Sequence, residues 1–235
     1  MRIEPYTEGS IVHVIKRGAR GMEIVRDAHD RERFLDSLLF LNDEFRNENW
    51  LRDISELPRF TRPAHWPERK PLVDIIAWTL LDNHVHLLIS IRGANDRGLT
   101  EFLQRLFRSM TGNFNAKYGG RGSIFQGPYR SVTIDSDSQL RYVIPYILVK
   151  NTFEMHPEGF AKAVRKFESS WEWATHYRYS SLESYTTGEF SPILTRPNII
   201  NEIFPTSRAL KIASKDMLLA YHARRDDLPR IEGEN

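Results

Sequence analysis

The chain has 235 residues, of which 40% are hydrophobic and 27% charged, and its formal net charge is +2 at pH 7. Such a length suits one substantial domain with extensions, or two small domains. The absence of cysteine excludes disulfides, thiolate zinc sites and cysteine nucleophiles. Because the sequence shows no apolar run long enough to span a bilayer and no secretory signal, we expect a cytoplasmic protein without a membrane partner.

The first half of the chain alternates strand and helix patterns. Strands are predicted at 11–16, 72–80 and 84–91, with the short turn LDN joining the last two. Apolar residues at near-helical spacing predict a helix over about 31–45. Residues 46–70 are rich in proline, charge and tryptophan, and they are predicted as an inserted loop.

The second half begins with the clearest helix pattern of the chain. Seven apolar side chains between residues 99 and 114 form one stripe, which predicts an amphipathic helix ended by the glycine pair at 119–120. Strand content follows at 123–134, around a Gly-Pro turn. A capped helix with Pro145 inside it is predicted over 136–151, and a mostly helical tail follows.

The order β-α-β-β-α-β-α, followed by helices, predicts an α+β protein with helices packed on one antiparallel sheet. We expect one domain over residues 1–190, with an insert at about 46–70, and a helical C-terminal extension over 191–235. That extension contains the basic helical pattern SRALKIASKDMLLAYHARR, which suits a DNA-binding accessory or a dimer brace equally well.

Positive charge is concentrated in the middle of the chain. Between residues 97 and 130, six basic side chains stand against a single acidic one, Glu101. A basic segment of this kind favours a polyanionic partner such as a nucleic acid, although a solvated helix face explains the same charge equally well.

His84 and His86 are separated by one valine on the third predicted strand. Since side chains alternate across a strand, both imidazoles point to one face, whereas Val85, Leu87 and Ile89 point to the other, in the core. Imidazole is the commonest metal ligand, so the pair could share one ion. Taken alone, however, such a pair is more often a hydrogen-bonded structural feature, and two histidines leave a metal shell incomplete.

Other segments of the chain lend weight to this pair. They are Asn83-His84-Val85-His86, Asn115-Ala116-Lys117-Tyr118, Gly122-Ser123-Ile124-Phe125-Gln126-Gly127, the N-terminal HVIKRGARG and the later WEWATHYRYSSLESY. In this order they resemble the motifs of the HUH-type single-tyrosine transposases, a group that includes the REP-associated tyrosine transposases of bacteria. The resemblance covers roughly residues 10–185.

The resemblance implies a ferredoxin-like core, with the HUH motif on a central strand, that binds single-stranded or hairpin DNA and cuts it. A tyrosine attacks the scissile phosphorus, becomes joined to the 5′ phosphate and releases a 3′ hydroxyl. A divalent metal, Mg²⁺ or Mn²⁺, is held by the two histidines and a polar side chain of the tyrosine helix, and such enzymes usually work as homodimers. The chemistry is consistent, since the ion offsets phosphate charge and a phenol, with a pKa of about 10, leaves readily when the strand is rejoined.

Tyr146 and Tyr142 compete for the role of nucleophile. The family phrase Tyr-φ-x-x-Asn-Pro is matched by Tyr146, but Asn151 lies five residues on instead of four and a threonine replaces the proline. Positions five apart on an ideal helix differ by about 140°, yet Pro145 could induce a π-type turn that returns both residues to one face. We therefore predict Tyr146 as the catalytic residue, Asn151 as the third metal ligand and Lys150 as a phosphate contact. Tyr142 is expected to pack in the core.

Candidate DNA contacts lie in the segments around this predicted site. Basic side chains would bind phosphates and make affinity dependent on salt, while aromatic rings would stack on unpaired bases. Gly18, in the Arg-Gly turn, would let the DNA backbone approach closely. Trp78 is expected in the core, and Phe125 suits a core or a stacking role equally. The candidates are Arg17, Arg105, Arg108, Lys117, Arg121, Phe125, Gln126, Arg130 and Lys150.

The sequence thus favours a metal-dependent transposase that nicks and rejoins single-stranded DNA at hairpins or repeats through a 5′-phosphotyrosine intermediate. The alternative is a domesticated DNA-binding protein of the same fold that no longer cuts. A metallophosphodiesterase that uses activated water would leave Tyr146 dispensable. An RNA-binding module would need surface aromatics on the central strands, a pattern the sequence lacks.

Overall fold

The computed structural model describes residues 6–196 and 198–227. Its four strands form one antiparallel sheet in the order β2-β3-β1-β4. They are β1 (Ile11–Arg17), β2 (Val73–Leu80), β3 (His84–Ile91) and β4 (Arg130–Ile134). All the predicted strands are therefore present, and β3 is one of the two inner strands.

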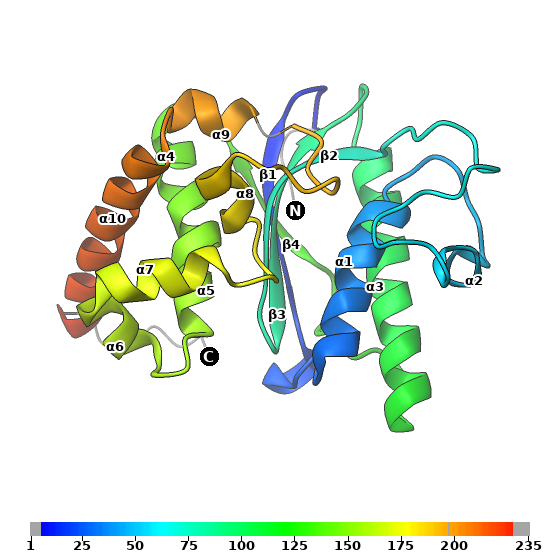
Figure 1. The fold of residues 1–235 in the computed structure, drawn as a ribbon, viewed down its shortest axis with the longest axis horizontal. Coiled ribbons are helices and arrows are strands. Elements are labelled where there is room, and N and C mark those ends of the chain that lie inside the picture. Colours follow the sequence, from blue (N-terminus) through cyan, green and yellow to red (C-terminus); the bar gives the residue numbers. More distant parts are fainter. Residues whose placement is uncertain (1–5, 197, 228–235) are drawn as a thin grey trace.

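Helices cover both faces of this sheet (Figure 1). On one face lie α1 (Ala28–Phe40) and α3 (Arg97–Tyr118), and on the other lie α4 (Asp137–Pro145) and α5 (Asn151–Glu154), joined by the π-helical η2 (Tyr146–Lys150). Because both faces are covered, β2 and β3 read as almost continuous apolar runs. The other helices are η1 (Ala19–Gly21), α2 (Trp50–Ile54), α6 (Phe160–Arg165), α7 (Phe167–Thr175), α8 (Leu182–Thr187), α9 (Asn198–Ile203) and α10 (Ser207–Asp227).

The helix predicted over about 31–45 begins and ends earlier, at Ala28–Phe40. It begins earlier because the side chain of Asp27 accepts a hydrogen bond from the backbone N–H of Asp30 and so caps the first turn. Beyond its end, both ends of the Asn42 amide bond to the backbone of β2, which directs the chain away from the helix axis. The Asn42 bonds join positions 31 residues apart, which the apolar periodicity of one segment does not reveal.

The insert at 46–70 is not a free loop. It contains α2, and the rings of Trp50 and Trp66 are buried against Phe40, with centroids 5.9 and 6.0 Å away. The indole N–H of Trp66 also donates to the carboxylate of Asp53. The two tryptophans therefore extend the core beyond α1, and this part of the prediction is corrected.

Two helix ends follow the predicted signals. Gly119 adopts a left-handed conformation, with φ of 68°, and ends α3. The side chain of Ser136 accepts a hydrogen bond from the N–H of Gln139 and begins α4. The helix predicted over 136–151 is present but continues to Glu154, in three pieces instead of one.

The break in that helix is the π-type turn predicted from Pro145. The N–H of Asn151 donates to the carbonyl of Tyr146, five residues earlier, so the turn is confirmed. An α-helix would have used the carbonyl of Ile147 for that bond. Here the hydroxyl of Thr79, on β2, lies 2.6 Å from the Ile147 oxygen and satisfies it. A hydrogen bond from the sheet thus stabilises the π-type turn.

The segment after residue 190 is helical from residue 198 on, apart from a short break at 204–206, whereas residues 191–196 form turns and irregular chain. It forms α9 and α10, and α10 packs against α4 and η2. Residues 228–235, the end of the predicted extension, lie outside the described residues. In the described part of the chain, no helix combines the length and apolarity needed to cross a bilayer.

Candidate functional site

The two strand histidines lie beside the π-helical segment. The ring centroids of His84 and His86 are 4.9 Å apart, and the ring of His86 lies 5.7 Å from that of Tyr146. Val85 and Leu87, on the opposite face of β3, are fully buried. The sequence-based expectation that both imidazoles share one face is therefore confirmed.

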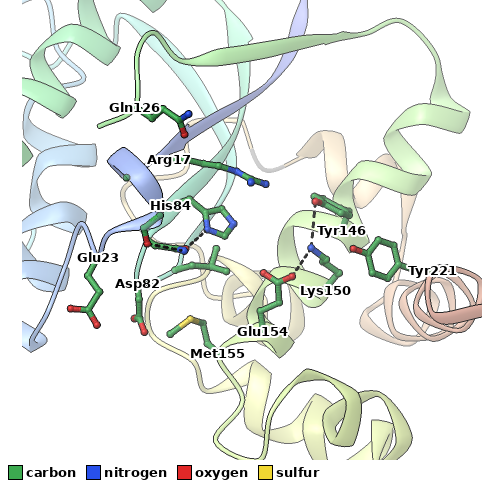
Figure 2. Close-up of a pocket in the computed structure, with 14 residues that line it drawn as sticks. Arg17, Glu23, Asp82, His84, Gln126, Tyr146, Lys150, Glu154, Met155 and Tyr221 are labelled. Carbon is green, nitrogen blue, oxygen red and sulfur yellow. Dashed lines mark hydrogen bonds and ion pairs between the residues drawn. The ribbon is translucent and has the colours of Figure 1, made fainter. Parts of the chain in front are cut away.

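A cavity of about 420 Å³ opens between the start of β3, the turn after β1 and η2. Figure 2 shows Arg17 and His84 on one side of it and Tyr146 and Lys150 on the other. Gln126 also lines it. The structure thus brings five of the predicted site residues together, in a space of the size that proteins use for small ligands.

Tyr146 shares this cavity with an ion pair whose lysine is buried and whose glutamate is partly exposed. Nζ of Lys150 lies 3.4 Å from the Tyr146 hydroxyl and 2.7 Å from a carboxylate oxygen of Glu154. Burial raises the pKa of Tyr146, and the charge of Lys150 opposes that rise. Burial alone would lower the pKa of Lys150, but the pairing with Glu154 outweighs it and the pKa rises. A permanent cation therefore stands beside the phenol and favours its ionised, nucleophilic form.

The imidazoles of this region are neutral at pH 7. Burial lowers the pKa of His13 to about 4, and burial with the nearby Arg17 lowers that of His84 to about 4. Burial also lowers the pKa of His86 well below its usual range. Nδ1 of His86 bonds to Nε2 of His13 at 2.8 Å, and Nδ1 of His84 bonds to Oδ1 of Asn83 at 2.6 Å. In His84 and His86 these bonds use Nδ1, so Nε2 could bind a ligand. Nε2 of His86 is buried and has no partner in the described part of the chain.

His13 is a site residue that the sequence analysis missed. In the pairing of β1 with β3, Ile15 lies opposite His86 and Arg17 lies opposite His84. Because residues two apart on a strand share a face, His13 projects to the same side as these residues. The sequence does show a histidine two positions before Ile15, the residue that lies opposite His86. To recognise His13 as a site residue, however, one must know the register between two strands about 70 residues apart.

The predicted third ligand, Asn151, is fully buried at the end of the π turn. Neither its Oδ1 nor its Nδ2 has a hydrogen-bond partner among the described residues. A buried amide left in this way costs free energy unless a ligand or water satisfies it. Imidazole nitrogens with an amide oxygen form a donor set that Mn²⁺ or Mg²⁺ accepts. The residues therefore fit a divalent ion.

Histidine and carboxylate groups alone do not complete such a site. Within residues 6–196 and 198–227, no group of three or more His, Cys, Asp and Glu side chains is arranged to hold a metal ion. A metal ion held by the two strand imidazoles would need a ligand of another type, and the Asn151 amide is a candidate.

The burial of the aromatic side chains near the predicted site agrees with the expectation for Trp78 but not for Tyr142. Trp78 is 3% exposed and belongs to the core, as predicted. The expectation that Tyr142 packs in the core is wrong, because its ring is 50% exposed and stacks on Tyr146 at a centroid distance of 6.1 Å. Phe125 is 5% exposed and packs against Phe107, so its ring belongs to the core and not to an exposed stacking surface.

The basic residues of α3 lie apart from the cavity. Arg105 bonds to Glu101 and, with Arg108, lines a separate hollow beside the insert. Lys117 pairs with Asp27 and Asp30 at 2.5 and 2.9 Å. Local ion pairs therefore neutralise part of the positive charge that the sequence concentrates here.

Two further cations are exposed. Arg121 lies in the loop after α3 and Arg130 begins β4, and neither makes an ion pair with another described residue. In the register of the sheet, Arg130 lies opposite Ile15, in the strand that also carries Arg17. The structure leaves both cations accessible but outside the lining of the Tyr146 cavity.

A close contact within the protein explains why a glycine follows Arg17. A Cβ at this position would lie 2.0 Å from the carbonyl oxygen of Met22, while its φ of −62° is open to any residue. The glycine is thus explained by the close approach of the chain to itself in the turn that aims Arg17 into the cavity.

No protein-family model matches the chain, and no curated protein does. One solved structure that it is similar to is that of a REP-associated tyrosine transposase bound to a REP hairpin. The two chains are 14% identical, the match covers 83% of this chain and 90% of that chain, and the TM-score is 0.49.

Proposed function

We propose that this protein is a DNA nicking and joining enzyme of the HUH single-tyrosine kind, with Tyr146 as its nucleophile. The observation that carries the proposal is the meeting of Tyr146, His84 and two cations, Arg17 and Lys150, in one cavity. A nucleophile, cations that offset the developing negative charge and metal-ligand nitrogens are the groups that attack on a phosphodiester requires.

The fold assigned in this proposal is a ferredoxin-like core. The elements follow one another as β1-α1-β2-β3-α3-β4, apart from the insert, and the antiparallel sheet has the order β2-β3-β1-β4. His84 and His86 then occupy an inner strand, and the tyrosine approaches from the helical layer on one face. The arrangement supports the HUH assignment of the histidine pair.

In the proposed step, the phenol oxygen of Tyr146 attacks the phosphorus of an unpaired strand. The Oη–P bond forms as the P–O3′ bond breaks, the phenolic proton passes to water in the open cavity, and the leaving 3′ oxygen takes up a proton. Lys150 stabilises the phenolate and Arg17 binds the phosphate charge. Attack by a 3′ hydroxyl on the phosphotyrosine reverses the step and rejoins DNA, because the phenolate is a good leaving group.

His84, His86 and Asn151 are the residues that would hold a divalent metal. Bound there, Mg²⁺ or Mn²⁺ would polarise a phosphate oxygen and offset its charge. The support is the buried, unpartnered state of His86 Nε2 and of the Asn151 amide among the described residues. Mixed imidazole and oxygen ligation suits Mn²⁺ somewhat better than Mg²⁺.

The test is incubation of the protein with end-labelled, single-stranded hairpin DNA and Mn²⁺, followed by a denaturing gel. Wild type is expected to give a covalent protein–DNA band that Tyr146→Phe loses and EDTA prevents. Tyr179→Phe is the matched control, since this hydroxyl bonds to Glu32 outside the cavity, and it should keep the band.

Three other outcomes would count against the proposal. A band lost only in Tyr142→Phe would move the nucleophile to Tyr142. Cleavage without any covalent band would indicate activated water. Binding without cleavage, across a varied set of hairpins, would indicate a domesticated DNA-binding protein with the same fold.

A further inference from the structure

A second hollow adjoins the Tyr146 cavity, between α4 and α10. Its volume is about 310 Å³, and its lining is Ser138, Arg141, Tyr142, Met217, Ala220 and Tyr221. Tyr221 also lines the Tyr146 cavity, so the two hollows meet at one side chain. Figure 2 shows Tyr221 beside Lys150, on the far side from His84.

The wall between the hollows is a pair of tyrosines. Tyr142, on α4, precedes Tyr146, the first residue of η2, by about one helical turn, a rise of about 6 Å. Their rings are 23° from parallel, with centroids 6.1 Å apart, and the Tyr142 ring is 50% exposed. A flat aromatic face is therefore presented one turn away from the proposed nucleophile.

The rim of the second hollow carries an anchored cation. Nη1 of Arg141 donates to the carbonyl of Ile203, and its guanidinium lies 5.9 Å from the ring of Phe204. Among the described residues, the remaining N–H groups of Arg141 have no acceptor, and they could bind a phosphate or a polar ring edge. An aromatic wall, an apolar floor and a cation at the rim suit a planar heterocycle attached to an anionic chain, which describes an unpaired nucleobase.

We propose that this second hollow, the Tyr142 subsite, binds the unpaired base next to the phosphate that Tyr146 attacks. The inference rests on the proposed function and adds to it a binding site for the base next to the scissile phosphate. Tyr142 acts as a positioning residue, because a base stacked on its ring fixes the strand where the phosphate meets the Tyr146 phenol. Alanine substitution of such a stacking ring weakens binding by about 5- to 150-fold.

The first experiment measures binding by the full chain, in EDTA, of a fluorescent oligothymidylate and of an abasic oligomer of equal length and charge. Tyr142→Ala is expected to weaken oligothymidylate binding by about 5- to 150-fold and to leave abasic binding unchanged. Tyr142→Phe should recover the affinity, since the ring is restored. Phe190→Ala removes another exposed ring, 40% accessible, and should match wild type.

Equal oligothymidylate binding by wild type and Tyr142→Ala would overturn the subsite. An equal loss on the abasic oligomer would do so too, because it would reflect a change in the protein and not in stacking. Failure of wild type to bind either oligomer would overturn it as well. Irradiation with an oligonucleotide that carries 5-iodouracil should crosslink Tyr142, as identified by peptide mapping, and crosslinks confined to other elements would contradict the proposal.

The covalent-adduct gel separates the two proposals. Base-dependent binding through Tyr142, with no adduct from wild type, would reject nicking and retain the subsite. Adduct formation with the same KM and kcat in wild type and Tyr142→Ala would reject the subsite and retain nicking. If both hold, Tyr142→Ala should raise KM for adduct formation more than it lowers kcat.

Discussion

The imidazoles of His13 and His86 are hydrogen-bonded to each other across neighbouring strands, Nε2 to Nδ1, at 2.8 Å. Both rings are buried, and they stack with centroids 5.0 Å apart. Because one nitrogen donates and the other accepts, this contact fixes a tautomer. When His86 offers the lone pair of Nε2 to an ion, its Nδ1 carries the proton and donates it to His13.

Removal of that acceptor should therefore weaken metal binding. His13→Leu is expected to lower Mn²⁺ affinity by about 10- to 100-fold, as measured by titration calorimetry without DNA. His13→Gln keeps an acceptor oxygen and should recover most of the affinity. His29→Ala, an exposed histidine on α1, is the matched control. Equal Mn²⁺ affinity in His13→Leu and wild type would show that the contact serves packing alone.

Asn151 and Asn42 form a natural comparison. Both amides are fully buried, but Asn42 bonds to the backbone of Val73 through both ends, whereas Asn151 has no partner among the described residues. In metal-free urea unfolding, Asn151→Leu should raise the free energy of unfolding by about 1–2 kcal/mol, because it removes an unsatisfied amide. Asn42→Leu should lower it by at least as much, because it breaks two satisfied bonds.

Addition of Mn²⁺ should reverse the effect of the Asn151 substitution. A ligand that binds only the folded state stabilises it, so wild type should gain stability with Mn²⁺ concentration. Asn151→Leu should gain much less if the amide is a ligand. Equal stabilisation of the two proteins by Mn²⁺ would remove Asn151 from the proposed site and leave its burial unexplained.

The parts of the site that were predictable are local in sequence. The shared face of His84 and His86 follows from the two-residue period of a strand. The π-type turn between Tyr146 and Asn151 follows from the disruption that Pro145 causes within one turn. Neither inference needs to know what packs against the element.

The parts that were missed depend on contacts between distant segments. The role of His13 requires the register of β1 against β3. The exposure of Tyr142 depends on how α10 covers α4, and the pairing of Lys117 with Asp27 joins residues 90 apart. Sequence periodicity predicts which face of an element is apolar, but not which polar groups a distant segment brings to the other face.

The pH dependence of stability has a specific source in Asp36, on α1. Burial raises the pKa of this carboxyl to about 6, although Arg33 and His29 oppose the rise and Nε of Arg59 lies 3.6 Å away. A pKa raised by folding means that the protonated form is favoured, so the stability is present at low pH and lost as pH rises through about 6. Asp36→Asn should therefore stabilise the protein at pH 7.5 by on the order of 2 kcal/mol and have little effect at pH 4.

Asp27, which caps the same helix, provides a control of opposite sign. The hydrogen bond from Lys117 and the cap bond lower the pKa of Asp27 to about 2. Its contribution is thus present above the ordinary pKa of an aspartate and is lost as pH falls through about 2. Asp27→Asn should destabilise the protein at pH 7.5, as seen by urea unfolding. Identical pH profiles for the two variants would contradict both assignments.

The last prediction concerns Lys150, which either tunes the phenol of Tyr146 or binds the phosphate. Its ammonium lies 3.4 Å from the Tyr146 hydroxyl and opposes the rise in the tyrosine pKa that burial causes. Lys150→Gln should therefore raise that pKa and move the rate profile for adduct formation to higher pH. At pH 7.5 the rate should fall by roughly tenfold or more.

The control is Lys166→Gln, since Lys166 is an exposed cation paired with Glu158, and its profile should match wild type. Tyrosinate absorbance, recorded on the free protein during a base titration, should show the same shift for Lys150→Gln without any DNA. A uniform loss of rate with an unshifted profile and unshifted absorbance would mean that the ammonium binds phosphate instead. In that case the phosphate must displace Glu154, which lies 2.7 Å from Nζ, and Glu154→Gln should then strengthen DNA binding.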